Sequence, residues 1–377
     1  MFLRAIIARI TLLPAFTRPC PGKARGLNRD MSTRKNNNMQ RRSLSTLVLI
    51  VIVTLMAGCK PITAPPVLSA ANPNVIDSHL HYFDFTQQTD GFGALVQAMD
   101  AAHIGRAVVF GMPIVKMWPE SEPIRPAYYL DTDAPAYYYS ATDLLMANQL
   151  LQQPPEVQAR FFPFLGGINP LDQNAADYLE MVIASYPPGF WRGIGEIMSR
   201  HDDLTAFTYG EPPRADHPAL MKVYQLAARH HLPVLIHHNI SSASQRDPIY
   251  LPELERAVAA NPDTTFIWAH VGISRRVDVP TLLTELRRLL ATYPNLNVDI
   301  SWVVYPDYIN RDDASLQAWA EVIEEFPDRF LIGSDKVGRW KGYTDMIRQY
   351  DTLLNRLSPE TAAAIAGGNL LKLLGQP

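Results

Sequence analysis

The chain has 377 residues, 47% hydrophobic and 19% charged, a balance that excludes disordered and fibrous proteins. The formal net charge of −3 is unevenly distributed, because residues 1–43 carry ten basic side chains and one acidic one, whereas residues 44–377 carry 24 basic and 36 acidic ones. This acidic body argues against nucleic-acid binding, which needs a basic surface.

The N-terminal part has the layout of a secretory signal. Arg41 and Arg42 precede an uncharged apolar run over 47–58. This run has about twelve residues, whereas a membrane-spanning helix needs about twenty. The sequence Leu55-Met56-Ala57-Gly58-Cys59 resembles the lipobox of bacterial lipoproteins, which implies cleavage before Cys59 and lipidation of its sulfur. An uncleaved N-terminal anchor is the alternative.

This interpretation divides the start of the chain into three segments. Residues 1–38 are predicted to be an over-extended start or n-region, 39–58 the lipoprotein signal peptide, and 59–74 a tether rich in Pro, Ala and Ser. We expect a lipid-anchored protein of the cell envelope, and Lys60 favours the outer membrane, on its periplasmic side, in a Gram-negative cell. Apart from Cys59, the only cysteine is Cys20, so the domain that follows has none for a disulfide or a thiolate metal site.

From Val75 onward, short apolar runs alternate with amphipathic stretches. The predicted strands cover 75–77, 107–110, 162–168, 193–197, 234–237, 265–270, 297–300 and 330–333, and helical patterns cover 92–103, 218–231, 252–261, 279–293 and 315–326. Eight such units over about 300 residues predict an α/β fold, a (β/α)8 TIM barrel that forms a single domain over 75–377. A doubly wound open sheet is the alternative, although no glycine-rich nucleotide motif supports it.

An insertion over 112–140, after the second strand, does not fit this repeat. It contains Trp118, five tyrosines and five prolines. A long loop of this composition would lie over the C-terminal mouth of the barrel, where substrates bind. A rigid aromatic cap, or a contact surface for a partner subunit, explains it equally well, and an oligomer is left open.

Two histidines, His79 and His81, follow the first strand. Because side chains alternate along a strand, Asp77, His79 and His81 are expected on one face. Two adjacent imidazoles can bind one metal ion while a carboxylate behind them fixes their orientation. A buried pair of hydrogen-bonded histidines would show the same pattern.

Other strands also end in polar side chains, each at the same place in its βα unit. The fourth ends in Glu196, the fifth in His237 and His238, the sixth in His270 and the eighth in Asp335. In a barrel these ends converge on one point, so six donors, His79, His81, Glu196, His237, His270 and Asp335, predict a metal site. We prefer His237 to its neighbour His238 because it directly ends an apolar strand.

These motifs together resemble the amidohydrolase-related (amidohydrolase 2) family of the metal-dependent amidohydrolase superfamily. The resemblance rests on Ile76-Asp77-Ser78-His79-Leu80-His81, the fifth-strand histidine, Trp268-Ala269-His270-Val271-Gly272, Leu331-Ile332-Gly333-Ser334-Asp335 and a Gly-Gly-Asn-Leu-Leu-Lys-Leu-Leu run over 367–374. It implies that His79, His81 and His237 bind metal and that Asp335 is both ligand and proton acceptor. It also implies that His270 ligates a second metal or acts as a catalytic acid/base, and that residues 367–374 form a closing helix.

The fourth strand departs from many superfamily members because it carries no lysine. Glu196 occupies that strand, as in the related TatD-like hydrolases, where a glutamate bridges two metals. One ion and two ions therefore both remain open. Imidazole and carboxylate donors without thiolates suit Zn²⁺, with Mn²⁺ also compatible.

The donor types predict the chemistry. A divalent metal with an open position lowers the pKa of water, Asp335 would accept the proton, and His270 is a candidate donor to the leaving group. Arg275 and Lys336 follow strand ends and could hold an anionic group of the substrate, although solvated surface cations would look the same. Trp302 and Tyr305 follow the seventh strand and could shape the pocket or simply pack under a loop.

The expected function is therefore that of a metal-dependent hydrolase acting on a small-molecule amide, lactone or ester. The alternative within the same family is a metal-dependent nonoxidative decarboxylase, and a binding module that keeps the barrel without catalysis is a third interpretation. Asp335 argues against the third, because a binding module needs no base.

Overall fold

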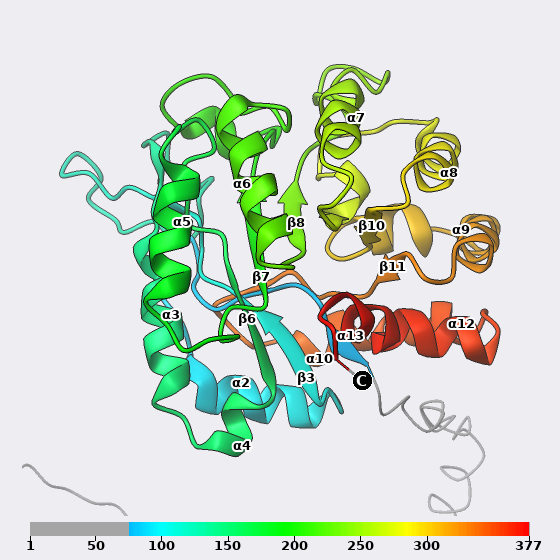
Figure 1. The fold of residues 1–377 in the computed structure, drawn as a ribbon, viewed down its shortest axis with the longest axis horizontal. Coiled ribbons are helices and arrows are strands. Elements are labelled where there is room, and N and C mark those ends of the chain that lie inside the picture. The colour runs from blue at the N-terminus through cyan, green and yellow to red at the C-terminus, as the bar shows by residue number, and fades with distance from the viewer. Residues whose placement is uncertain (1–74, 377) are drawn as a thin grey trace, which may run out of the picture. The chain divides into compact units, whose positions relative to one another are not determined.

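The computed structural model describes residues 75–376 (Figure 1). The predicted over-extended start, signal peptide, lipidated Cys59 and tether lie outside these residues. Eight parallel strands form one sheet in the order β1–β3–β6–β7–β8–β9–β10–β11, which confirms the predicted α/β fold. Their bounds are β1 (Ile76–Asp77), β3 (Arg106–Val109), β6 (Phe161–Leu165), β7 (Gly193–Met198), β8 (Val234–His237), β9 (Phe266–Trp268), β10 (Leu296–Asp299) and β11 (Phe330–Leu331).

Backbone hydrogen bonds join the first and last parts of this sheet. The Ser78 amide donates to the Ile332 carbonyl at 2.9 Å. Beyond that bond, β2 (Leu80–His81) pairs in parallel with β12 (Lys336–Val337). The sheet therefore curls until its edges meet, and the carboxyl ends of its strands face one point.

Helices surround the sheet (Figure 1). They are α2 (Gly91–Ala101), α3 (Ala141–Leu151), α4 (Pro155–Gln158), α5 (Ala175–Ala184), α6 (Pro218–Arg229), α7 (Leu251–Ala260), α8 (Leu282–Thr292), α9 (Asp313–Glu325), α10 (Tyr343–Arg348), α11 (Asp351–Leu354), α12 (Pro359–Ala363) and α13 (Asn369–Leu373), with shorter turns η1 (Leu204–Phe207), η2 (Ala269–Gly272), η3 (Tyr305–Ile309) and η4 (Ala364–Gly368). In α8, for example, Leu282, Leu286 and Leu289 recur at helical spacing and are all buried. Among residues 75–376, no helix has the length and apolar composition that crossing a membrane requires.

The barrel interior has its own apolar core, separate from the layer between strands and helices. Alternate strand residues such as Val108, Phe164 and Leu235 form this inner cluster. Leu370 of α13 and Leu374 belong to the same cluster. The run over 367–374 therefore packs against the barrel interior, as the family resemblance implied.

The strand that was expected to run into His79 and His81 is broken. β1 ends at Asp77 and β2 begins at Leu80. Asp77 accepts hydrogen bonds from the Ser334 amide and hydroxyl (2.8 and 2.6 Å) and from the Tyr343 hydroxyl (3.0 Å). The expectation that Asp77 supports the imidazoles is wrong, because the break interrupts the alternation of side chains.

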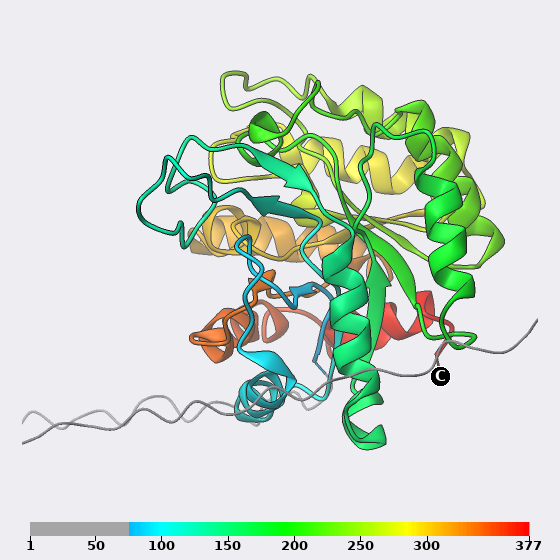
Figure 2. The same cartoon turned by 90° about the vertical axis from the view of Figure 1, so that its left-hand side faces the viewer.

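The insertion over 112–140 contains a two-stranded antiparallel hairpin and projects from the barrel (Figure 2). Its strands are β4 (Ile114–Lys116) and β5 (Ala136–Tyr138). The Tyr138 hydroxyl donates to the Met198 carbonyl at 3.2 Å, and the buried Lys116 ammonium donates to the Thr132 carbonyl at 2.7 Å. The Tyr138 bond attaches the insertion to the end of β7, and the Lys116 bond joins two parts of the insertion to each other, so the insertion forms a wall of the barrel mouth.

Candidate metal centre

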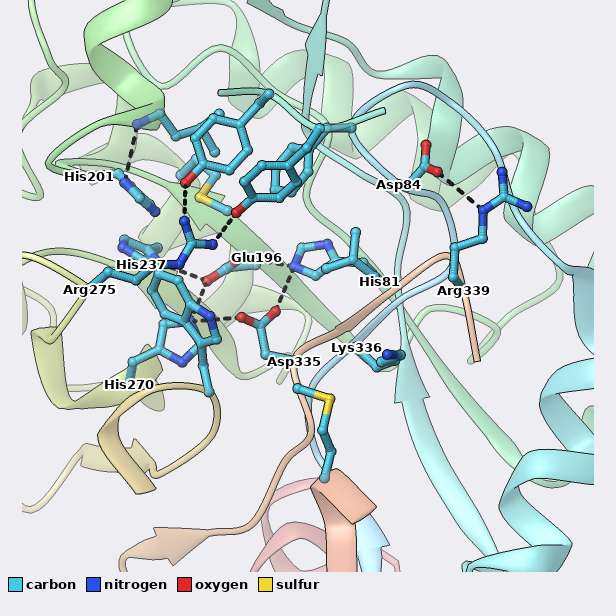
Figure 3. Close-up of a pocket in the computed structure, with 18 of the residues that line it drawn as sticks. His81, Asp84, Glu196, His201, His237, His270, Arg275, Asp335, Lys336 and Arg339 are labelled. Atoms are coloured by element: carbon cyan, nitrogen blue, oxygen red, sulfur yellow. Dashed lines mark hydrogen bonds and ion pairs between the residues drawn. The ribbon is translucent and has the colours of Figure 1, made fainter. Parts of the chain in front are cut away.

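The six side chains predicted as metal ligands lie together at the carboxyl ends of the strands, and Figure 3 labels all of them except His79. His79 and His81 come from the break before β2 and from β2 itself, Glu196 from β7, His237 from β8, His270 from η2 and Asp335 from the residue before β12. Five of them are buried, and the Asp335 side chain keeps 12% of its surface exposed. The barrel brings these residues together although up to 256 positions separate them along the chain.

The Glu196 carboxylate lies between two pairs of imidazoles. Its Oε2 is 3.2 Å from His81 Nε2 and 3.6 Å from His79 Nε2. Its Oε1 is 3.1 Å from His237 Nδ1 and 3.5 Å from His270 Nε2. Each carboxylate oxygen therefore faces one histidine pair.

The carboxylate of Asp335, near the C-terminus, also lies close to both histidine pairs. Its Oδ1 is 3.3 Å from His81 Nε2 and 3.4 Å from His79 Nε2, and its Oδ2 is 3.8 Å from His270 Nε2. The Asp335 amide donates to the His79 carbonyl at 2.8 Å. Two carboxylates thus occupy the space enclosed by the imidazoles.

A local irregularity in β7 turns Glu196 into the barrel. The pairing of β7 with β8 shifts register between Ile194 and Ile197, and both isoleucines pack in the layer outside the sheet. In a regular strand, residues three apart would face opposite sides. A bulge adds one residue and redirects the side chains beside it, so Glu196 points inward.

Three residues at the centre have left-handed backbones that non-glycine residues rarely adopt. The φ angles are +53° at His270, +58° at Trp302 and +49° at Asp335. Such conformations persist where the surrounding structure fixes them, and they concentrate at functional sites. Here they lie two to four residues beyond the ends of β9, β10 and β11, and their side chains line the cavity at the barrel mouth.

Groups behind the imidazoles orient them. His79 Nδ1 lies 2.6 Å from Asp299 Oδ2, and the same oxygen accepts a hydrogen bond from the Ser301 hydroxyl at 2.8 Å. Ser301 Oγ is in turn 2.9 Å from His270 Nδ1. On the other side, His81 Nδ1 lies 3.0 Å from the Gly111 carbonyl. Sequence reasoning missed Asp299 and Ser301, although both follow the same strand-end pattern as the other residues.

Two atoms of the centre are buried without any hydrogen-bond partner. They are His79 Nε2 and Glu196 Oε2. An unpaired buried polar atom costs about 1–3 kcal/mol, so such atoms usually have a partner. A divalent cation between them would satisfy both, and the donor set of imidazole nitrogens and carboxylate oxygens is one that Zn²⁺ or Mn²⁺ accepts. The residues therefore fit a metal centre.

The electrostatics of the cluster also favour a cation. Burial lowers the pKa of His81, but Asp335 and Glu196 outweigh it and raise that pKa to about 9. Burial opposes ionisation of Glu196, yet His79, His237 and His270 hold its pKa well below the usual range. The carboxylates thus stay ionised and attract positive charge, either protons on the imidazoles or a metal ion that competes with those protons.

Of the two adjacent histidines on β8, His237 joins the cluster and His238 points elsewhere. His238 Nδ1 lies 2.9 Å from the Ser199 hydroxyl and its Nε2 lies 3.1 Å from the Tyr250 carbonyl. Burial lowers the pKa of His238 to about 3, so it is neutral. The alternation along β8 separates the two side chains as predicted.

A cavity of ≈ 330 Å³ opens above the cluster and is lined by His81, Glu196, His237, His270 and Asp335. Arg275, Lys336 and Trp302, the predicted substrate residues, line the same cavity. Arg275 donates to the hydroxyls of Tyr128 and Tyr129 from the insertion, and its guanidinium carbon lies 5.1 Å from the Trp302 ring centre.

Lys336 and Tyr305, which the sequence also suggested as pocket residues, already form hydrogen bonds within the protein. Lys336 donates from Nζ to the Lys341 carbonyl at 2.7 Å, so this ammonium already has a partner. Tyr305 is buried, and its hydroxyl donates to the Gln349 carbonyl at 2.9 Å. Tyr305 is not a lining residue of this cavity.

His201, in the loop after β7, is a cavity residue that sequence reasoning missed. Its ring stacks on His237 with centres 4.6 Å apart and planes 19° apart. Asp202 and Asp203 lie beside it, but Asp202 pairs with Arg276 at 2.7 Å and Asp203 accepts from Tyr129 at 2.9 Å. These bonds engage the neighbouring carboxylates within the protein.

Comparison with known proteins gives one family and a set of similar folds. The family model described as Amidohydrolase matches residues 76–376. A zinc-bound amidohydrolase from Burkholderia multivorans is 16% identical, with a TM-score of 0.52, and the match covers 80% of this chain and 99% of that one. An uncharacterised TIM-barrel protein from Bordetella bronchiseptica is 14% identical, with a TM-score of 0.51 and coverage of 80% and 98%. No curated protein matches the sequence significantly.

Proposed function

This chain belongs to the amidohydrolase family, and we propose that it is a metal-dependent hydrolase of a small amide, lactone or ester. The observation that carries the proposal is the position of Glu196. One of its oxygens faces His79 and His81, and the other faces His237 and His270. A carboxylate placed in this way can bridge two ions, an arrangement suited to hydrolysis.

In this proposal His79 and His81 hold one ion, and His237 and His270 hold the second. Glu196 lies between the pairs, and Asp335 contributes from the cavity side. Zn²⁺ is the preferred ion because all donors are imidazoles and carboxylates, and Mn²⁺ fits the same set. When bound, the ions would acidify water and polarise the carbonyl group of the substrate.

Asp335 is the proposed proton acceptor. Burial opposes its ionisation, but His79, His81 and His270 lower its pKa, so the carboxylate is charged and can take a proton from water. It also lines the cavity, where the substrate would bind. The oxygen of that water joins the carbonyl carbon, the bond to the amine or alcohol breaks, and Asp335 returns the proton to the leaving group.

His270 has a different role in each version of the chemistry. Its Nε2 lies 3.5 Å from Glu196 Oε1 and would help to hold a second ion, while its Nδ1 is held by Ser301. With one ion at His79, His81 and Asp335, His270 would be free to donate a proton, which a decarboxylase needs for the ring carbon that loses CO₂. A test of the proposal must therefore distinguish decarboxylation from hydrolysis.

The test is the origin of the oxygen in the product. The purified chain, supplied with Zn²⁺ or Mn²⁺, is screened against p-nitrophenyl esters, aliphatic and aromatic lactones, N-acyl amides and hydroxybenzoates. We expect one ¹⁸O atom from labelled water in the product of an ester, lactone or amide, and no turnover by Asp335→Asn. Release of CO₂ from a hydroxybenzoate, without ¹⁸O incorporation, would replace the proposal with the decarboxylase.

A further inference from the structure

We propose that His201 is a substrate-contacting residue that donates a hydrogen bond from Nε2 to an oxygen of the substrate. The inference rests on the proposed function, because it concerns the same cavity. It concerns a residue outside the six predicted metal ligands and follows from how the ring of His201 is held.

The backbone around His201 is locked by Thr205. The His201 amide donates to the Thr205 hydroxyl at 3.0 Å, and that hydroxyl donates back to the His201 carbonyl at 2.8 Å. Parallel stacking on His237 fixes the plane of the ring. With both backbone and ring plane fixed, the two ring nitrogens have defined surroundings.

Nδ1 of His201 is turned toward two backbone amides. The Asp203 amide lies 3.3 Å from it and the Leu204 amide lies 3.2 Å from it, and both donate hydrogen bonds to this nitrogen. A backbone amide can only donate, so Nδ1 must present its lone pair to these two groups. The proton of the neutral imidazole is then on Nε2.

Two carboxylates could favour the other tautomer. Asp202 Oδ1 lies 3.4 Å from His201 Nδ1 and accepts a hydrogen bond from the Ser274 hydroxyl, whereas Asp203 Oδ1 lies 2.9 Å from the same nitrogen. The Asp203 oxygen already accepts a hydrogen bond from the Tyr129 hydroxyl at 2.9 Å. The other oxygen of Asp203 lies 3.8 Å from Arg276. The two amides directed at the lone pair outweigh these two carboxylate oxygens, because each oxygen already accepts a hydrogen bond from another donor.

Nε2 of His201 is directed into the cavity. The ring points from its loop toward the metal centre in Figure 3, and His201 is a lining residue. None of the described residues forms a hydrogen bond with this nitrogen, and it is not among their fully buried unpaired atoms. The donor is therefore free for a group that enters from solvent.

The surroundings define the chemistry of that group. The Trp302 ring centre lies 5.9 Å from the His201 ring centre, and the Arg275 guanidinium carbon lies 5.1 Å from the same indole. His201 and Arg275 thus place two donors beside one aromatic surface. A group that accepts hydrogen bonds and is attached to a flat or apolar body, such as a carboxylate or an ester carbonyl on a ring, fits this wall.

The first test reads the tautomer directly. Protein labelled with ¹⁵N-histidine and loaded with Zn²⁺ is examined by long-range ¹H–¹⁵N correlation, and the His201 signals are those that His201→Gln removes. We expect a protonated Nε2 and an unprotonated Nδ1. Benzoate, a probe with a carboxylate on a ring, is expected to shift the Nε2 signal. A protonated Nδ1, or no shift with benzoate, would overturn the inference even if the enzyme hydrolyses esters.

The second test compares two substitutions in an ester or lactone that the enzyme turns over. His201→Gln keeps an amide donor, whereas His201→Met keeps the volume and loses the donor. We expect kcat/KM to fall at least about tenfold in His201→Met and to recover in part in His201→Gln, since a hydrogen bond to a polar or charged group is lost and then restored. Metal content is expected to stay at the wild-type level in both.

His230→Gln, at the C-terminal end of α6 and away from the cavity, is the matched control and should leave kcat/KM unchanged. Equal kcat/KM in His201→Met and wild type would contradict a substrate contact. No turnover of any compound by wild type would instead count against the proposed function, and the tautomer and benzoate measurements would still decide the role of His201.

Discussion

A single carboxylate, Asp299, supports two of the imidazoles at the centre. It lies 2.6 Å from His79 Nδ1 and accepts from Ser301, whose hydroxyl contacts His270 Nδ1. In both His79 and His270, Nε2 is therefore the nitrogen that faces the carboxylates of Glu196 and Asp335. Such groups behind metal ligands fix the tautomer and the orientation of the ring, and they contribute to affinity without touching the metal.

Substitution of Asp299 should therefore weaken metal binding. We expect Asp299→Asn to reduce the affinity for Zn²⁺ about 10- to 100-fold, because the amide cannot accept from the imidazole as strongly as a carboxylate does. Competition with a chromophoric chelator measures this. Asn297→Ala, two residues earlier on β10, removes a hydrogen bond to the Phe266 carbonyl and should leave the affinity unchanged. Equal affinities in Asp299→Asn and wild type would contradict the supporting role.

At the scale of the element, the bulge in β7 determines where Glu196 points. Gly195 has a φ of +135°, and a Cβ atom on it would lie 2.3 Å from the Leu235 carbonyl oxygen on β8. Only glycine fits this backbone and this close approach. Gly195 therefore allows the backbone conformation that directs the Glu196 carboxylate into the barrel.

Gly195→Ala tests this requirement. We expect it to lower the free energy of unfolding by about 2–4 kcal/mol, because the added methyl group meets backbone atoms in an unfavourable conformation. Gly93→Ala is the matched control, since Gly93 lies in α2 with nothing within 4 Å of an added Cβ. That change should be neutral or stabilise by up to about 1 kcal/mol. Similar denaturation midpoints for the two variants would contradict the argument.

The barrel and most of the centre could be predicted from the sequence because each βα unit repeats the same local pattern. An apolar run that ends in a polar residue identifies a strand and its carboxyl end together, and the strand over 234–237 matches the structure residue for residue. The predicted strand over 265–270 is shorter in the structure, because η2 begins at Ala269. The donor at its end, His270, nevertheless lies at the centre.

The residues that were missed depend on tertiary contacts. His201 follows β7 in an irregular loop, and only its stacking on His237 shows that it lines the cavity. Asp77 was expected to orient the imidazoles, but Asp299 is the carboxylate that contacts His79. The alternation of side chains along a strand does not reveal the break between β1 and β2. Bulges, breaks and loop conformations are set by neighbouring strands, so local patterns do not reveal them.

At the scale of the whole molecule, buried Asp143 makes stability depend on pH. Burial raises its pKa from 3.8 to about 6, although the amides of Gly111, Gly166 and Gly167 donate to it and oppose the shift. Because the folded-state pKa exceeds the unfolded one, this contribution to stability is fully present below pH 3.8 and is lost as the pH rises through about 6.

The difference in unfolding free energy between wild type and Asp143→Asn should therefore decrease by roughly 2 kcal/mol from about pH 4 to pH 7, since a shift of one pKa unit corresponds to 1.36 kcal/mol and part of the effect is already lost at pH 4. Denaturant titrations of both proteins across this range measure it. A difference that is constant between the two pH values would show that the carboxyl group titrates equally in the folded and unfolded states.

The proposed attachment to a membrane belongs to the same scale. If Cys59 is lipidated, cells grown with radiolabelled palmitate should yield a labelled protein in the membrane fraction. Cys59→Ala should abolish the label and release the protein from that fraction. Labelled protein from the Cys59→Ala variant would contradict the lipoprotein interpretation, and neither result bears on the chemistry of the barrel.

The metal content of the purified chain tests the central claim most directly. Elemental analysis is applied to wild type, Glu196→Gln and a control, Glu253→Gln, which removes another buried carboxylate that pairs with Arg200 at 2.7 Å. We predict two divalent ions per chain in wild type and in Glu253→Gln, and one in Glu196→Gln. Wild-type protein without stoichiometric metal, or Glu196→Gln with the same metal content as wild type, would contradict a metal centre bridged by Glu196.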